Sequence, residues 1–333
     1  MTGTTVAGAT QINGSNASLL FYPNDVAIDN NNNIFVADTN NNRIQLWISG
    51  SLSGVTVAGD ETAGSNSTEL CYPHSIFVNT YNNSNDLYVA DHCNNRIQKY
   101  PNGANTGTTV AGGNGPGVDY RQINGSYGVY VTNDNTIYIS DTGNDRVMKW
   151  LFGSSVGLLV AGAQGTGSAS NQFDSPRGLF VISNGDVYVA DNNNHRIQRW
   201  TYGASNGTTV AGGNGAGNSL SQLTYPRAVI VDEAGGDLYI SDTNNHRIMK
   251  WKIGATSGIV IAGSSTGTAG STATTLYYPN GISLDSNQNL YVADSVNHRI
   301  QEFQAYTSKV VTGLEILGRS GQSPIGLKIF LDQ

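Results

Sequence analysis

One phrase recurs six times at nearly even spacing, and this periodicity constrains the fold more than any other feature of the sequence. It reads FVADTNNNRIQLW at 35–47 and YVADHCNNRIQKY at 88–100, and the later copies differ from these at few positions. Successive aspartates of the phrase lie 53, 50, 50, 51 and 52 residues apart, so one unit fills nearly all of the 333 residues without a linker. These aspartates are Asp38, Asp91, Asp141, Asp191, Asp242 and Asp294. The arginine five positions after each of them is Arg43, Arg96, Arg146, Arg196, Arg247 and Arg299.

Each unit contains four short runs that are typical of β-strands. In the fifth unit they are GTTVAG at 207–212, AVIVD at 228–232, DLYISD at 237–242 and HRIMKW at 246–251. The runs are rich in β-branched and aromatic residues, and Gly, Asn and Asp stand between them, which indicates tight turns. No stretch has a helical period, which excludes a helical solenoid. Four strands in a unit of about 50 residues predict an all-β, six-bladed β-propeller.

The phrase also resembles a known repeat. The pattern [YF]-[VI]-[AS]-D-x-x-[ND]-x-R-[IV], preceded by a strand that opens Y-P-x, is similar to the NHL repeat, and the resemblance covers residues 3–304. It implies a six-bladed propeller of four-stranded blades. It does not imply one function, because that family includes enzymes, RNA-binding proteins and protein-interaction modules.

The order of the strands predicts how the ring closes. The chain opens with GTTVAG at 3–8, an outer-strand sequence, before any inner strand, and its sixth unit ends at HRIQEF, 298–303. We therefore expect the N-terminal strand to complete the last blade, with KVVTG at 309–313 as the alternative. The expected domains are one propeller over 1–313 and a C-terminal tail of uncertain packing over 314–333.

The repeated Asp–Arg pairs are expected to be structural, because every blade has one wherever a site lies. The Asp ends a strand at a turn, so its carboxylate can accept free N–H groups of that turn. The Arg can reach a carboxylate or carbonyl groups on a neighbouring blade. Three blades place His195, His246 or His298 just before the Arg. Sheets pack about 10 Å apart, so these histidines lie too far from one another to share a metal ion.

Composition limits the partners. The formal net charge is −7 and the pI is about 5.1, which argues against nucleic acid, whose binding needs a basic face. No run of 18 apolar residues occurs, so no membrane span is expected. The start, MTGTTVAG, lacks the features of a signal peptide. We expect a monomer or one part of a larger multidomain protein.

A candidate site follows from the geometry of a propeller. The innermost strands converge on the axis, so the residue that follows the Pro of each unit, or Ser126 in the third unit, is expected to line one mouth of the ring. The six positions differ chemically, as a binding site on a repeated scaffold would. Arg177 and Arg227 stand on adjacent blades and can clamp a carboxylate or phosphate. The six predicted residues are Asn24, His74, Tyr127, Arg177, Arg227 and Asn280.

The second unit alone contains cysteine. Cys71 lies two residues before Pro73, and Cys93 lies in a turn expected at the same end of the blade, so a disulfide is geometrically reasonable and two free thiols are the alternative. A disulfide implies an oxidising compartment. Six N-x-[ST] sequons also suit a secreted protein, at Asn13, Asn16, Asn66, Asn82, Asn124 and Asn206. We therefore expect an extracellular protein, with a cytoplasmic one as the alternative.

This unit resembles the peptidyl-α-hydroxyglycine α-amidating lyase domain. In that family a Cys before the Pro of strand one is joined to a Cys in a D-x-x-C-N-x-R-I turn, which implies a Cys71–Cys93 bond here. The family holds zinc with histidines, two of them in P-H-[SD] sequences, whereas this chain has one such sequence, Pro73-His74-Ser75. His74 and His92, with Asp25 or Asp91, are the weak candidates for a metal site.

The expected function is binding without catalysis: a propeller that takes a protein, a peptide or a small anionic ligand at the axial mouth, with no cofactor. One alternative is a zinc-dependent lyase or hydrolase centred on His74. If the protein does have a cofactor, zinc or calcium is the expected metal. The other is the substrate-recruiting propeller of a ubiquitin ligase, which requires a cytoplasmic setting and no disulfide.

Overall fold

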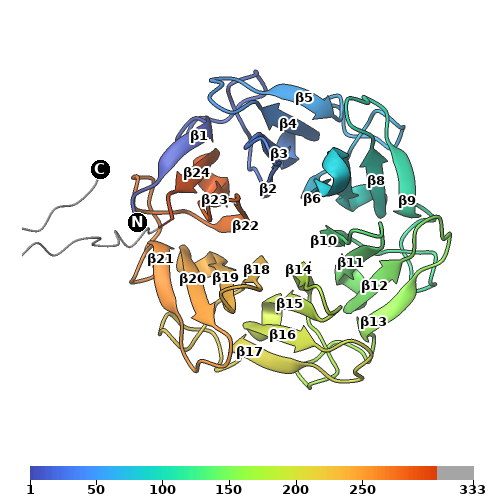
Figure 1. Ribbon diagram of the computed structural model, residues 1–333, viewed down its shortest axis with the longest axis vertical. Helices are drawn as coiled ribbons and strands as arrows, with labels where there is room; N and C mark the ends of the chain where they lie inside the picture. The colour runs from blue at the N-terminus through green and yellow to red at the C-terminus, as the bar shows by residue number, and fades with distance from the viewer. Residues whose placement is uncertain (306–333) are drawn as a thin grey trace, which may run out of the picture.

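The chain forms a ring of six four-stranded antiparallel sheets around a central axis, as the repeat predicts (Figure 1). The computed structural model describes residues 1–305. The predicted tail over 314–333 and the alternative closing strand at 309–313 lie outside the described residues.

Every sheet has the same order of strands from the axis outwards. The innermost strands are β2 (Asp25–Ile28), β6 (Pro73–Asn79), β10 (Ser126–Val131), β14 (Pro176–Val181), β18 (Val229–Asp232) and β22 (Pro279–Leu284). The second strands are β3 (Ile34–Asp38), β7 (Asp86–Asp91), β11 (Ile137–Asp141), β15 (Val187–Asp191), β19 (Asp237–Asp242) and β23 (Leu290–Asp294). The third strands are β4 (Arg43–Trp47), β8 (Arg96–Tyr100), β12 (Arg146–Trp150), β16 (Arg196–Trp200), β20 (Arg247–Lys252) and β24 (Arg299–Phe303). The outer strands are β5 (Val55–Ala58), β9 (Thr108–Gly112), β13 (Leu158–Gly162), β17 (Thr208–Gly212), β21 (Ile259–Gly263) and β1 (Thr4–Gly8).

The N-terminal strand closes the ring, as predicted. β1 pairs antiparallel with β24, with Thr4 opposite Glu302 and Gly8 opposite Arg299, so blade 6 combines the two ends of the described chain. Ala7 of β1 is buried beside Ile300 in the core of that blade. The pairing covers the edge of β24, which would otherwise be open.

The repeated phrase forms the turn between the second and third strands of each blade. A single 3₁₀ turn, such as η3 (His92–Asn94), is followed by one residue in the left-handed conformation. The other five turns are η1 (Thr39–Asn41), η4 (Thr142–Asn144), η5 (Asn192–Asn194), η6 (Thr243–Asn245) and η7 (Ser295–Asn297). Asn, Asp and His tolerate the left-handed conformation better than bulkier residues, which explains why the phrase restricts this position.

Each repeated Asp is buried and forms an ion pair with the Arg of the same phrase. The Nε–Oδ2 distances lie between 2.6 and 2.8 Å. The Arg also donates to carbonyl groups of the loop that leads into its own blade, as Arg96 does to Ser65, Asn66 and Glu69. The pair therefore fixes the loop that precedes the innermost strand to the turn between the second and third strands.

The sequence interpretation of these pairs was wrong in one detail. The Asp does not cap its own turn. Its Oδ1 accepts a backbone N–H from the loop before the innermost strand, as Asp91 does from Cys71 at 2.7 Å. The reason is geometric: the carboxylate points back along the sheet toward the entry loop, where the same Arg donates.

The left-handed residue of each turn links neighbouring blades. Its side chain accepts a backbone N–H at the entrance of the next blade: Asn42 accepts from Tyr72 at 3.0 Å, and the Nδ1 of His195 accepts from Tyr225 at 3.2 Å. Asn95, Asp145, His246 and His298 do the same. The three histidines of this set are thus hydrogen-bond acceptors at three of the six junctions between blades.

The hydrophobic core lies between blades. Each of the six buried clusters combines side chains of two adjacent sheets. The third strands of four blades have a Trp as their last residue or the one before it, and no more than 2% of its surface is exposed: Trp47, Trp150, Trp200 and Trp251. Each sheet therefore buries both of its faces, one against each neighbouring blade.

Candidate functional site: the axial mouth

The residues predicted for the axial mouth stand together where the innermost strands begin. Contacts link Asn24 to His74, His74 to Tyr127, Tyr127 to Arg177 and Arg227 to Asn280. Arg227 lies close enough to Arg177 for the charge of Arg177 to lower its pKa. Below them the strands approach closely, because small residues follow: Gly178 donates its N–H to the carbonyl of Arg227 at 2.8 Å, and Gly281 donates to Asn24 at 2.8 Å. A Cβ atom at Gly178 would lie 2.6 Å from the Arg227 carbonyl oxygen, so a larger residue would force these strands apart.

One half of the mouth is a cluster of neutral rings. The His74 ring lies 4.0 Å from Tyr127 and 4.3 Å from His92, centroid to centroid, and His74 also bonds to the amide of Asn24. Burial, and then the positive charge of His92 and Arg177, holds the pKa of His74 well below its usual value. His92 also has a lowered pKa because it is partly buried. Both imidazoles are therefore neutral near pH 7.

The other half of the mouth holds two guanidinium groups. The Arg177 guanidinium lies 4.3 Å from the centre of the Tyr127 ring, and Arg227 donates to the side-chain oxygen of Asn280 at 2.9 Å. Asn280 is fixed in turn by donating to Ser295 at 2.7 Å. Burial lowers the pKa of Arg177, and burial together with the charge of Arg177 lowers the pKa of Arg227 to about 10. Both groups are still charged near pH 7.

Within residues 1–305 these two arginines have no counter-ion. Apart from Lys149, Arg177 and Arg227, every Lys and Arg side chain of residues 1–305 has a carboxylate oxygen within 4.0 Å. The Nε and Nη1 atoms of Arg177 are buried and have no hydrogen-bond partner within the described residues. Leaving such donors unpaired is costly, so the mouth is poised to accept an anion.

Asp25 lies directly below the mouth, on the axis. It stands beside Ser75 and close against Gly281, and it lines a cavity of about 190 Å³ that runs between the innermost strands. Its carboxylate accepts the backbone N–H groups of Val26 at 2.9 Å and Ile76 at 3.0 Å. From the sequence, Asp25 is predicted only as a possible metal ligand. Its equivalents in the other blades are small, and that contrast is the signal in the sequence that sets it apart.

Asp25 should titrate near pH 6. Burial raises its pKa to about 6, against the bonds from Ile76, Ser75 and Val26. A raised carboxyl pKa means that the folded state binds the proton more tightly than the unfolded chain does. The stability that this group contributes is thus full below about pH 4 and is lost as the pH rises through about 6. A ¹³C-carboxyl titration should show this step in the wild type and lose it in Asp25→Asn; a midpoint near 4 would contradict it.

The structure gives His74 and His92 no further metal ligand. Within residues 1–305 no group of three or more His, Cys, Asp or Glu side chains is arranged to hold a metal ion. The Nδ1 of His92 meets the backbone carbonyl of Ser126 at 3.2 Å, and His74 bonds to Asn24. The zinc-dependent alternative is therefore left without a complete set of ligands in the described part of the chain.

The two cysteines are neighbours, but they are free thiols, so the predicted disulfide is not formed in this structure. The N–H of Cys93 donates to the carbonyl of Cys71 at 3.2 Å, and the side chains are hydrogen-bonded. Partial burial and the bond to Cys71 raise the pKa of Cys93 to about 12. The Cys93 thiol is thus protonated near pH 7.

Comparison with known families identifies the repeat. A family model described as the NHL repeat matches residues 22–46, 70–100, 173–200, 223–251 and 276–303. The chain is an NHL-repeat β-propeller. The matches fall on blades 1, 2, 4, 5 and 6. Blade 3 of this NHL propeller has no match, and it is the blade in which Ser126 replaces the Pro that opens the other innermost strands.

Solved structures share the fold at low sequence identity. A protein of unknown function from Bacteroides thetaiotaomicron has a TM-score of 0.70 at 15% identity, over 91% of this chain and 75% of that one. An auxiliary nutrient binding protein from the same organism has a TM-score of 0.67 at 16% identity, over 90% and 75%. A gluconolactonase from Xanthomonas campestris has a TM-score of 0.63 at 13% identity, over 89% and 88%. The search of curated proteins finds no match. In residues 1–305, no helix has the length and hydrophobicity needed to cross a membrane.

Proposed function

We propose that this NHL propeller is a non-catalytic binding module that takes the carboxylate or phosphate group of a small molecule or peptide in its axial mouth. Arg177 and Arg227 bind the anion, Tyr127 and Asn280 hold these two arginines in place, and the neutral pair His74 and His92 forms the uncharged wall beside them. An extracellular setting stays a prediction that rests on the sequons.

One observation carries this proposal: two guanidinium groups adjoin at the axis with no carboxylate within 4.0 Å of either, while the remaining described cations except Lys149 are paired. Burial, and then the charge of Arg177, lowers the pKa of Arg227. A folded protein retains such a pair at a cost to stability, and a bound anion removes that cost. The nutrient-binding protein among the structural neighbours is compatible with this function through its fold alone.

Calorimetric titration with citrate, inorganic phosphate and a tripeptide with a free C-terminal carboxylate tests the proposal, with the C-terminal amide of the same peptide as the uncharged comparison. We expect at least one anion to bind and the double variant R177M/R227M to lose about 100-fold in affinity, since each hydrogen bond to a charged group contributes about 1.5–3 kcal/mol. Binding of citrate or the tripeptide indicates a carboxylate ligand, and binding of inorganic phosphate indicates a phosphate ligand.

The matched control is Arg199→Met, which removes an arginine that is paired with Asp186 at 2.5 Å on another part of blade 4. It should leave anion affinity within about twofold of the wild type, because the pair is partly exposed and remote from the mouth. The thermal midpoint of R177M/R227M without ligand should equal or exceed that of the wild type, since a repulsive pair is gone. Equal anion affinity in R177M/R227M and the wild type would overturn the proposal.

A further inference from the structure

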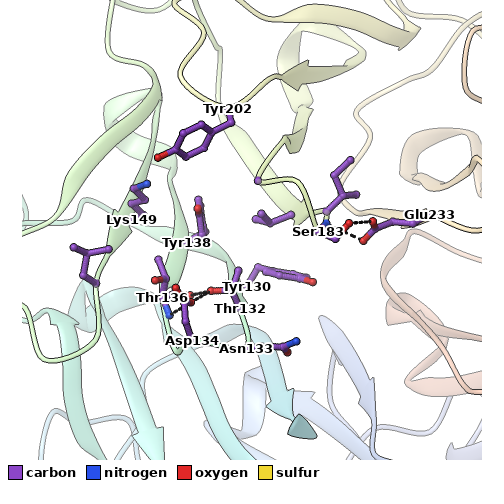
Figure 2. Close-up of a pocket in the computed structure, with 14 residues that line it drawn as sticks. Tyr130, Thr132, Asn133, Asp134, Thr136, Tyr138, Lys149, Ser183, Tyr202 and Glu233 are labelled. Carbon is purple, nitrogen blue, oxygen red and sulfur yellow. Dashed lines mark hydrogen bonds between the residues drawn. The ribbon is translucent and has the colours of Figure 1, made fainter.

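A second hollow, of about 640 Å³, lies between blades 3 and 4 at the end of β10 opposite the axial mouth (Figure 2). Tyr127 of the mouth stands near the start of β10, and Thr132 follows its end. The hollow therefore opens on the other face of the ring. Figure 2 shows Lys149, Tyr138 and Tyr202 on one side of it and the Ser183–Glu233 pair on the other.

Lys149 is the cation of this hollow, and it lacks the partner that its equivalents have. In four blades a Lys or Arg of the third strand lies opposite a Tyr of the second strand, as Lys149 lies opposite Tyr138. In the other three of these blades an Asp two residues before the Tyr takes the cation: Asp86 with Lys99 at 2.7 Å, Asp186 with Arg199 at 2.5 Å and Asp237 with Lys250 at 2.9 Å. Blade 3 has Thr136 at that position, so Lys149 has no carboxylate within 4.0 Å among residues 1–305.

Aromatic rings flank this ammonium group. Its Nζ atom lies 5.3 Å from the centre of the Tyr202 ring and 5.9 Å from that of Tyr138. Tyr202 belongs to the β16–β17 loop of blade 4, and 72% of its surface is exposed. An exposed ring beside a charged group is a platform on which the apolar face of a sugar can stack while its polar groups reach neighbouring side chains.

Two carboxylates on the hollow's wall are held in place by hydrogen bonds, one from its own loop and one from the neighbouring blade. Asp134 accepts from the Thr132 hydroxyl at 2.5 Å and from the Thr136 N–H at 3.1 Å. Glu233, which comes from blade 5, accepts from the N–H and hydroxyl of Ser183 at 3.0 and 2.5 Å. Each carboxylate has lone pairs left over, so both can accept hydrogen bonds from ligand hydroxyl groups.

We propose that this hollow binds an acidic saccharide, with the sugar carboxylate on Lys149, hydroxyl groups on Asp134 and Glu233, and the ring face on Tyr202. The wall carries one ammonium and two carboxylates, so it offers one place for an anionic group and two acceptors for hydroxyl groups. A hydroxyl-rich ligand with one carboxylate on each ring matches both the cation and the acceptors.

Calorimetry with digalacturonate, and with cellobiose as the neutral comparison, tests this site. Digalacturonate should bind more tightly than cellobiose, and Lys149→Gln should weaken its binding by about tenfold or more, the usual effect of losing a hydrogen bond to a charged group. Thr136→Asp introduces the Asp that three other blades have, so it should pair with Lys149 and weaken binding similarly while the third-strand Lys is kept. Tyr202→Ala should weaken both sugars.

Lys99→Gln is the matched control, because it removes the equivalent lysine of blade 2, which is already paired with Asp86. Its affinity for digalacturonate should equal that of the wild type. Should Thr136→Asp prove unstable, Lys149→Gln and Lys99→Gln still decide the question. No binding of digalacturonate, equal binding of cellobiose, or equal losses in Lys149→Gln and Lys99→Gln would each overturn the proposal.

Discussion

Asp242→Ala should lower the free energy of unfolding by about 3–5 kcal/mol, the usual cost of removing one partner of a buried ion pair. Arg247 has no exposed surface and is bonded to Asp242 at 2.7 Å. Without the carboxylate, its charge stays buried among the carbonyl groups of the entry loop. The N–H of Thr224 also loses its acceptor, which lies at 2.7 Å. Urea denaturation followed by circular dichroism measures the change.

Asp237→Ala is the control for this variant, in the same blade and also next to a cation. Its partner Lys250 is about one-third exposed, at 2.9 Å, and such pairs contribute about 0–1 kcal/mol. If the two variants lost equal stability, the repeated Asp–Arg pair would be a surface feature and its place in the architecture would have to be reconsidered.

Deletion of residues 1–8 should open the ring. The outer strand of blade 6 then leaves, and the ladder between β1 and β24 leaves with it. We expect a loss on the order of 4 kcal/mol at about 1 kcal/mol for each backbone hydrogen bond. The exposed edge of β24 should also pair with other molecules. Scanning calorimetry should show a lower midpoint, and sedimentation velocity should show association that grows with concentration.

Thr4→Ala combined with Thr5→Ala is the control for the deletion, since both side chains are exposed and the backbone ladder stays. This variant should stay monomeric, with a midpoint near that of the wild type. A deletion variant that remained a monomer with an unchanged midpoint would show that β1 is dispensable for closing the ring.

The repeat predicted the fold because a blade is a local object. Strand lengths, the turn after each Asp and the first outer strand at 3–8 are all encoded within about 50 residues, and six nearly equal units leave the ring as the way to bury every sheet face. The same argument predicted that the six mouth residues lie together, since the position that follows the Pro, or Ser126 in blade 3, has a fixed place in each unit.

Features that depend on two blades at once escaped the sequence analysis. The sequence indicated only that His195, His246 and His298 lie too far apart to share a metal ion. The assembled ring shows that each of them accepts an N–H from the next blade. The direction of Asp91 toward Cys71 rather than its own turn is likewise a matter of three-dimensional placement. Cys71 and Cys93 lie together in blade 2 as free cysteines, so the predicted disulfide is not confirmed.

The sequence alone determined the number of blades, their strand order, the closing strand and the diversity of the mouth, because each follows from the spacing of one repeated unit. Only the tertiary structure decided which charges are paired. Among residues 1–305 it left Arg177 and Arg227 without a carboxylate partner. It placed Lys149 beside the rings of Tyr138 and Tyr202, with Thr136 at the position where three other blades have an Asp. Ion pairing depends on distances between side chains of different strands and blades, and spacing along the chain does not fix those distances.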